Sequence, residues 1–171
     1  MHLSGVALLN AFLLSFLLLS SWAATLAAQR PDPVAEISGG SISFTDATES
    51  YVGSAARFYV LPRVSLGPEV TYVFGEDHSH LIVTGNFVFD FLRPEEGRLR
   101  RVSPFGLVGG GIFQTRNQFP VFNFNSTEGA FTAGGGIRMA FGNRVTIGGD
   151  VRVGWELHAR AGGTIGIRLG K

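Results

Sequence analysis

The stretch from Phe131 to Trp155 reads FTAGGGIRMAFGNRVTIGGDVRVGW, and its pattern decides the fold. Bulky apolar residues alternate in it with glycine or with a full charge. In an extended strand this alternation places the apolar side chains on one face and Arg138, Asp150 and Arg152 on the other. The apolar face must be covered, and the charged face must lie in a crowded space where glycine leaves room. Which of the two faces lies inside decides the kind of protein.

The composition favours one β domain that is not fully surrounded by water. The chain has 171 residues, the usual size of one domain, of which 45% are hydrophobic and only 16% charged. The 24 glycines and 15 phenylalanines favour tightly packed strands over helices. A net charge of +1 gives no electrostatic footprint for nucleic acid. With no cysteine, the chain can form no disulfide and carries no lipid-anchored N-terminal cysteine.

The first 28 residues are interpreted as a secretory signal peptide, followed by a barrel domain over residues 29–171. An apolar run ends in small residues near Ala27 and Ala28, and the sequence then turns abruptly polar. The n-region has no Lys or Arg, and the run from Val6 to Ala28 is long enough to span a bilayer. An uncleaved N-terminal anchor is therefore the alternative.

Beyond Pro33 the hydrophobic period is two, and turns rich in polar residues, Gly or Pro separate the runs. Two glycines, Gly39 and Gly40, change the phase of the first run, which predicts a β-bulge there. About eight strands are expected, a number typical of the smallest membrane barrels. They are expected near residues 36–44, 54–61, 64–74, 80–92, 104–115, 130–141, 145–156 and 160–170.

The strands have one apolar face and one face that is polar, charged or small. We place Phe105, Leu107 and Phe113 on the apolar face, with most of the large apolar residues of the other strands. The charges on the polar face can pair with one another, which avoids stranding a charge in a low dielectric. This expected ion-pair network comprises Arg57, Glu69, Asp90, Arg138, Asp150, Arg152, Glu156, Arg160 and Arg168.

An eight-stranded interior is only just wide enough for side chains or one small ligand. A soluble, lipocalin-like binding barrel would have to fit the whole apolar set inside, and its phenylalanines overfill that space. In the inverted arrangement the apolar face contacts lipid and the charged face fills the lumen. The sequence therefore predicts an all-β, eight-stranded, antiparallel up-and-down transmembrane β-barrel with a polar and charged lumen.

Aromatic residues are expected at two heights on this barrel, as aromatic girdles at the two membrane interfaces would be. With the N-terminus on the periplasmic side, odd strands run outward and even strands return. One rim then collects Phe44, Tyr72, Phe74, Phe113, Phe131 and Trp155, and the other collects Phe89, Phe91, Phe105 and Phe141.

The chain resembles the small outer-membrane β-barrel proteins of Gram-negative bacteria, such as the transmembrane domain of outer-membrane protein A. The resemblance covers residues 36–169 and is clearest in SPFGLVGGGIF, in the Phe131–Trp155 stretch and in GGTIGIRLG. It implies outer-membrane residence, contact with lipid and lipopolysaccharide, and insertion by the outer-membrane assembly machinery. That machinery usually recognises a terminal aromatic residue, whereas this chain ends Leu169, Gly170, Lys171.

A structural or surface-interaction role without cofactor or catalysis is the leading hypothesis, in a monomer whose lumen is closed by Arg/Asp/Glu pairs. The family implies lipid A-modifying enzymes as the alternative. The candidate cluster for catalysis is GEDHSH, residues 75–80, in which extended backbone would point Ser79 away from His78 and His80. The two histidines, with Glu76 or Asp77, are also a weak candidate for a metal site.

The longest segment between strands, residues 114–129, is expected to project as an external loop. Phe119, Phe122 and Phe124 are spread through it. They either extend the hairpin and cap the barrel rim, or form an exposed patch that contacts lipopolysaccharide or a partner.

Overall fold

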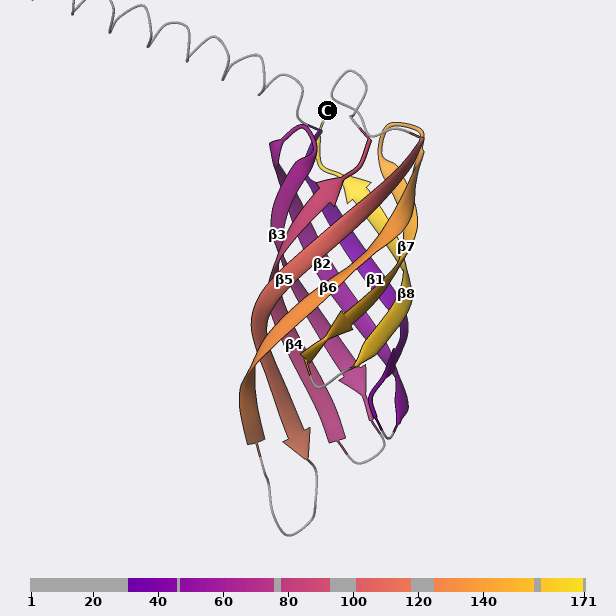
Figure 1. The fold of residues 1–171 in the computed structure, drawn as a ribbon. Helices are drawn as coiled ribbons and strands as arrows, with labels where there is room; N and C mark the ends of the chain where they lie inside the picture. The colour runs from indigo at the N-terminus through magenta and orange to yellow at the C-terminus, as the bar shows by residue number, and fades with distance from the viewer. Residues whose placement is uncertain are drawn as a thin grey trace, which may run out of the picture.

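The computed structural model describes residues 31–45, 47–75, 78–92, 101–117, 125–155 and 158–170. They form a closed barrel in which each strand pairs antiparallel with the next and β8 pairs with β1 (Figure 1). The expected eight-stranded up-and-down barrel is confirmed. Its strands are β1 (Val34–Ser43), β2 (Thr48–Leu61), β3 (Val64–Phe74), β4 (His78–Asp90), β5 (Val102–Asn117), β6 (Asn125–Phe141), β7 (Val145–Gly154) and β8 (Ala159–Arg168).

The barrel has two different ends. The terminal end carries the start of β1, the end of β8 and the β2–β3, β4–β5 and β6–β7 connections. The loop end carries the other four connections, and there β6 extends beyond β7, with which it pairs only from Thr132 onward (Figure 1). β5 and β6 have 16 and 17 residues, against 10 in β1, β7 and β8, and both run further toward the loop end than the sequence pattern predicts.

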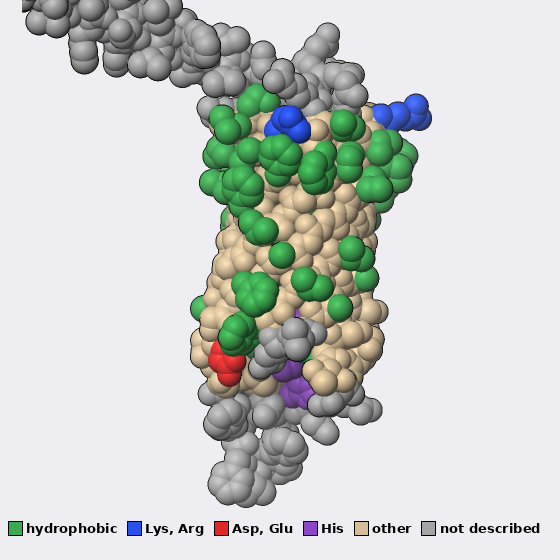
Figure 2. All heavy atoms as spheres, in the orientation of Figure 1, with side chains coloured by type: hydrophobic (Ala, Val, Ile, Leu, Met, Phe, Trp, Pro, Cys, Tyr) green, Lys and Arg blue, Asp and Glu red, His purple; other side chains and the backbone are tan. Residues whose placement is uncertain are grey.

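Side chains alternate between an apolar exterior and a mixed interior along every strand, as the pleat requires. On β7, Val151 and Val153 are 65% and 58% exposed, whereas Asp150 and Arg152 between and beside them are buried. Figure 2 shows hydrophobic side chains gathered around the terminal end on one face, with charged side chains only near the two ends of the described surface. The exterior is therefore apolar where the interior is charged.

The phase predicted for β5 is wrong. Phe105, Leu107 and Phe113 point into the barrel and are at most 7% exposed, while Val108 and Ile112 face outward. β5 carries apolar residues at both odd and even positions, so its own pattern does not choose a face. Its pairing with β4, where Asp90 lies opposite Phe105, fixes the choice.

The bulge predicted at Gly39 and Gly40 is absent: β1 pairs continuously with β2 and with β8. The register shift lies instead in β2, between Tyr59 and Leu61. The apolar pattern of β1 changes phase because the interior itself becomes apolar near the loop end, where Ile42 is completely buried.

Aromatic side chains surround both ends of the apolar exterior, in smaller sets than expected. Tyr72, Phe74, Phe131 and Trp155 face outward toward the loop end, and Phe89, Phe91 and Phe141 toward the terminal end. Phe105 and Phe113 do not belong to these girdles because they point inward. Phe44 does not belong either, because it packs on the inward Phe113 with ring centroids 6.3 Å apart.

Within the described residues there is no helix long and apolar enough to cross a membrane. The expected signal peptide, residues 1–28, lies outside the described part of the chain.

Candidate functional site: the barrel interior and its mouth

The centre of the interior is built around the carboxylate of Glu69 on β3. Its Oε2 accepts hydrogen bonds from Arg152 Nη1 at 2.6 Å and from Asn86 Nδ2 at 2.7 Å. Its Oε1 accepts from Arg160 Nη2 at 2.5 Å and from the Thr71 hydroxyl at 3.3 Å. One carboxylate thus joins β3 to β4, β7 and β8, and its four donors satisfy both oxygens in a buried site.

Asp150 completes this central cluster. Arg152 donates to it from Nε at 2.9 Å and from Nη2 at 3.0 Å, the bidentate geometry that a planar guanidinium favours. Both side chains lie on β7, two residues apart on the same face. Arg152 is therefore held between two carboxylates, Asp150 beside it and Glu69 across the barrel.

A second polar cluster lies toward the terminal end, around Asp90 on β4. Its Oδ1 accepts from Arg138 Nη1 at 3.0 Å, and its Oδ2 accepts from the Tyr59 hydroxyl at 3.0 Å. Arg138 also donates to the Tyr59 oxygen at 3.2 Å. Arg57 pairs with Glu36 nearby. The guanidinium of Arg138 lies over the ring of Phe105, 4.0 Å from its centroid, which gives that inward phenylalanine a role.

Inward glycines make the space that these side chains occupy. A Cβ built on Gly162 would lie 2.0 Å from the Tyr51 hydroxyl, and one on Gly136 would lie 2.9 Å from the Asp150 Cβ. A Cβ on Gly109 would lie 1.9 Å from Asn86 Oδ1. Glycine in these strands therefore leaves room for larger side chains on the neighbouring strands, as the Phe131–Trp155 stretch suggests.

Little free volume remains among the polar side chains. Cavities of about 30 Å³ and about 20 Å³ lie beside Glu69 and Arg152, the first toward Arg57 and the second toward His158. Each has room for about one or two water molecules. The described residues thus leave no wide path between these polar clusters.

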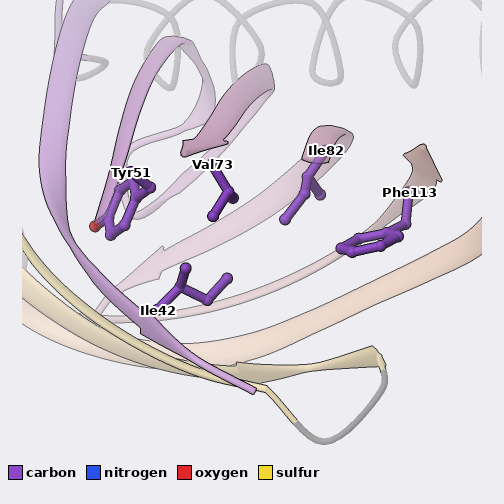
Figure 3. Packing of buried hydrophobic residues seen from close by; sticks show 5 residues of the cluster. All are labelled: Ile42, Tyr51, Val73, Ile82 and Phe113. Carbon is purple, nitrogen blue, oxygen red and sulfur yellow. The ribbon is translucent and has the colours of Figure 1, made fainter. Parts of the chain in front are cut away.

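Toward the loop end the interior becomes apolar. Ile42, Tyr51, Val73, Ile82 and Phe113 point inward from five different strands and pack into one cluster (Figure 3). Phe44 packs against the same cluster. A layer of hydrocarbon therefore separates the central ion pairs from the loop end.

Three titratable side chains meet at the mouth beyond this layer. His78 Nε2 lies 2.8 Å from Glu49 Oε1, and the ring of His80 lies 4.8 Å from that of His78. Each of the three residues offers a ligand atom within 4.8 Å of the other two. His80 Nδ1 is 3.0 Å from the Thr115 hydroxyl. Ser79 falls between the two histidines on the strand, so its side chain takes the opposite face.

A fourth mouth residue, His158, precedes β8. Its Nδ1 contacts the carbonyl oxygen of Trp155. Burial lowers the pKa of the His158 imidazole, and Arg160 lowers it further, while the carbonyl hydrogen bond opposes the shift. The lowered pKa favours the neutral form of the His158 imidazole.

The structure places the predicted charged residues inside the barrel wherever it describes them. Those buried in the interior are Arg57, Glu69, Asp90, Arg138, Asp150, Arg152, Arg160 and Arg168. Glu156 lies outside the described residues, as do Glu76 and Asp77 and the loop phenylalanines Phe119, Phe122 and Phe124.

Sequence reasoning missed Glu36, Glu49 and Tyr59 as interior partners. The even positions of β1 carry the signal for Glu36, which follows Val34 on the inward face. Glu49 alternates with Tyr51 at the start of β2, ahead of the point where we expected that strand to begin.

A closed barrel of eight antiparallel strands, apolar outside and charged inside, defines the class of eight-stranded transmembrane β-barrels. Solved structures of outer-membrane proteins share the fold. The N-terminal barrel domain of Pseudomonas aeruginosa OprF matches with a TM-score of 0.66 and 11% identity, over 80% of this chain and 97% of that one.

Two further structures are similar. Neisserial surface protein A matches with a TM-score of 0.66 and 10% identity, over 80% of this chain and 96% of that one. Ail, the attachment invasion locus protein of Yersinia pestis, matches with a TM-score of 0.53 and 12% identity, over 81% and 97%. No family model matches the chain, and no curated protein matches its sequence. The likeness is one of fold.

Proposed function

We propose that this protein is a monomeric, non-enzymatic barrel of the outer membrane, with a closed lumen and a structural or surface-interaction role. The observation that supports membrane residence most strongly is the inverted distribution of side chains. Val151 and Leu169 are more than 60% exposed, while Arg152 and Arg168 beside them in sequence are buried. Water would not favour that exterior, and lipid would.

The ion pairs and the apolar layer support the closed lumen. Four buried arginines, Arg57, Arg138, Arg152 and Arg160, pair with the interior carboxylates of Glu36, Asp90, Glu69 and Asp150. The interior charge of these clusters is therefore largely compensated. The Ile42–Phe113 layer from β1–β5 adds hydrocarbon between these ion pairs and the loop end. Both features favour a scaffold over a diffusion channel.

A surface role would be carried by the loop end, which faces outward if the chain ends are periplasmic. β5 and β6 are the longest strands, and residues 118–124 connect them in the sequence at this end. Loops on rigid scaffolds are where binding residues concentrate. Lipopolysaccharide is the partner we propose for Phe119, Phe122 and Phe124, and the outer-membrane assembly machinery is the partner we propose for insertion.

A lipid A-modifying enzyme is the alternative, and the mouth gives it little support. A serine nucleophile must lie within hydrogen-bond reach of its base. Ser79 takes the opposite face of β4 from His78 and His80, and the hydroxyl nearest His80 is that of Thr115.

Membrane residence is tested by fractionating cells that express the chain and by comparing heated and unheated protein on a gel. We expect the chain in the outer-membrane fraction, with a folded band that shifts on boiling. A chain that stays in the soluble fraction, with a gel band that does not shift on boiling, would overturn the proposal.

The closed lumen is tested by refolding the protein into planar lipid bilayers beside a trimeric porin as the positive control. We expect no large, stable conductance steps from this chain. Porin-sized steps would show that the lumen is open and would overturn the scaffold role.

The surface role is tested by replacing Phe119, Phe122 and Phe124 with serine. We expect weaker association with lipopolysaccharide, with heat-modifiability unchanged. If lipopolysaccharide association is unchanged while the loop is still accessible to protease, the surface role is wrong and the loop only caps the hairpin.

A further inference from the structure

We propose that Glu49, His78 and His80 form a binding site for a divalent transition-metal ion, with zinc as the best match. The site lies at the mouth of the barrel, on the loop-end side of the apolar layer. It joins β2 to β4 and is independent of the loop phenylalanines.

The backbone brings these residues together across the end of β3. Ser50 of β2 pairs with Phe74, the last residue of β3, so Glu49 reaches the level of Gly75. His78 and His80 share the inward face of β4 and begin the strand that follows. A hydrogen bond spans the connection from β3 to β4, in which the Gly75 amide donates to the His78 carbonyl oxygen at 3.1 Å.

Gly75 keeps the space between the ligands clear. A Cβ at this position would lie 2.7 Å from Glu49 Oε1 and 2.9 Å from His78 Nε2. Any side chain there would push the carboxylate and the imidazole apart. The residue that follows β3 is therefore the one type that lets Glu49 and His78 approach each other.

The ligand set fits zinc chemically. Zinc binds imidazole nitrogen and carboxylate oxygen at about 2.0–2.2 Å, which places ligand atoms about 3.4 Å from one another. The three ligand atoms here already lie within 4.8 Å of one another, so side-chain movements of about 1 Å would suffice. His78 is about a third exposed, which leaves an open coordination position toward solvent.

An unsatisfied oxygen and a fixed ring point to a cation. Glu49 is 9% exposed, and its Oε2 is buried without a hydrogen-bond partner among the described residues. A desolvated carboxylate oxygen without a partner is costly, and a bound cation would offset that cost. The hydroxyl of Thr115 holds His80 through Nδ1, which leaves Nε2 for the metal, as outer-shell partners do in zinc sites.

His158 is excluded from the ligand set. The ring of Phe44 lies 5.1 Å from that of His80 and 5.7 Å from that of His158, and packs against both. The Nδ1 of His158 is occupied by the Trp155 carbonyl. This histidine therefore serves as the matched control.

The test uses the full chain without a polyhistidine tag, refolded in detergent micelles and titrated calorimetrically with zinc chloride. We expect one zinc per chain and little response to magnesium, which prefers an all-oxygen ligand set. Glu49→Gln should weaken zinc binding at least about tenfold. His80→Asn, which keeps the Nδ1-type contact to Thr115 and removes Nε2, should do the same.

The control His158→Asn keeps a donor for the Trp155 carbonyl and should bind zinc as the wild type does. Each variant is first checked for heat-modifiable migration. If His80→Asn does not fold, NMR of the wild type replaces it, and zinc must shift the ring signals of His78 and His80. Absence of that shift, no zinc uptake by the wild type, or full binding by folded Glu49→Gln would overturn the proposal.

Discussion

The two halves of the barrel interior are built on different physical principles. The centre and the terminal end are held by directional ion pairs, in which Glu69 and Asp90 each accept from an arginine and from neutral donors. The loop-end half is held by an apolar layer in which side chains from five strands exclude water. The first arrangement is sensitive to the loss of a partner and the second to the loss of volume. The comparison can be tested by variants that remove one or the other.

The largest effect is expected from Glu69→Ala in the central cluster. The change leaves Arg152 and Arg160 buried without the carboxylate between them, and breaking a buried pair on one side costs about 3–5 kcal/mol. Urea unfolding of the protein in lipid vesicles, followed by tryptophan fluorescence, measures the loss. A loss below about 1 kcal/mol would show that water replaces the carboxylate and that the ion pairs do not hold the centre.

A smaller effect is expected from Ile42→Ala in the apolar layer. Ile42 is completely buried, and truncation to alanine in a packed core costs about 2–5 kcal/mol. We expect the lower part of that range, because the mouth is near enough for water to fill the gap. The same unfolding assay at low and high salt separates the halves, since salt should leave this loss unchanged. A salt-dependent loss would contradict the division.

Gly162→Ala tests the close packing between the two halves. Its Cβ would meet the Tyr51 hydroxyl at 2.0 Å, and overpacking of this kind costs about 1–3 kcal/mol. Tyr51→Phe removes that oxygen, which has no hydrogen-bond partner in the described structure, so the double variant should recover part of the stability. If the double variant is as unstable as Gly162→Ala alone, the contact with the Gly39 carbonyl at 2.8 Å dominates instead.

Tyr59→Phe should have the smallest effect. The change removes the hydroxyl that donates to Asp90 and accepts from Arg138, while the Arg138–Asp90 pair remains. We expect a loss of about 1 kcal/mol in the free energy of unfolding. The unfolding midpoint reports it. A loss as large as that of Glu69→Ala would mean that the hydroxyl, and not the ion pair, organises the terminal-end cluster.

The same division explains what could be predicted from the sequence. The inward face of the charged half could be predicted because Arg138, Asp150 and Arg152 alternate with outward apolar residues. The inward face of the loop-end half could not be predicted in this way. Ile42 and Phe113 point inward, yet they belong to the same residue types as the lipid-facing residues, and only pairing with neighbouring strands fixes their direction.

For a related reason, only the two histidines of the candidate metal site could be predicted from the sequence. His78 and His80 stand two apart in a strand, a spacing that shares a face. Glu49 lies 29 positions before His78 in the numbering and meets it only because β3 ends at Phe74. No local pattern carries that information, because it depends on the register of two hairpins.

The central cluster has a consequence for how the chain is assembled. Glu69 lies 83 residues before Arg152 and 91 before Arg160, so its two arginine partners arrive only with the last two strands. Until β8 closes on β1, a growing sheet in lipid would hold the Glu69 charge on one part and the arginine charges on another. Contacts so distant in sequence form slowly, and leaving these charges uncompensated in hydrocarbon costs several kcal/mol each. The stabilisation of the central cluster is therefore gained only when β7 and β8 are in place and the barrel has closed.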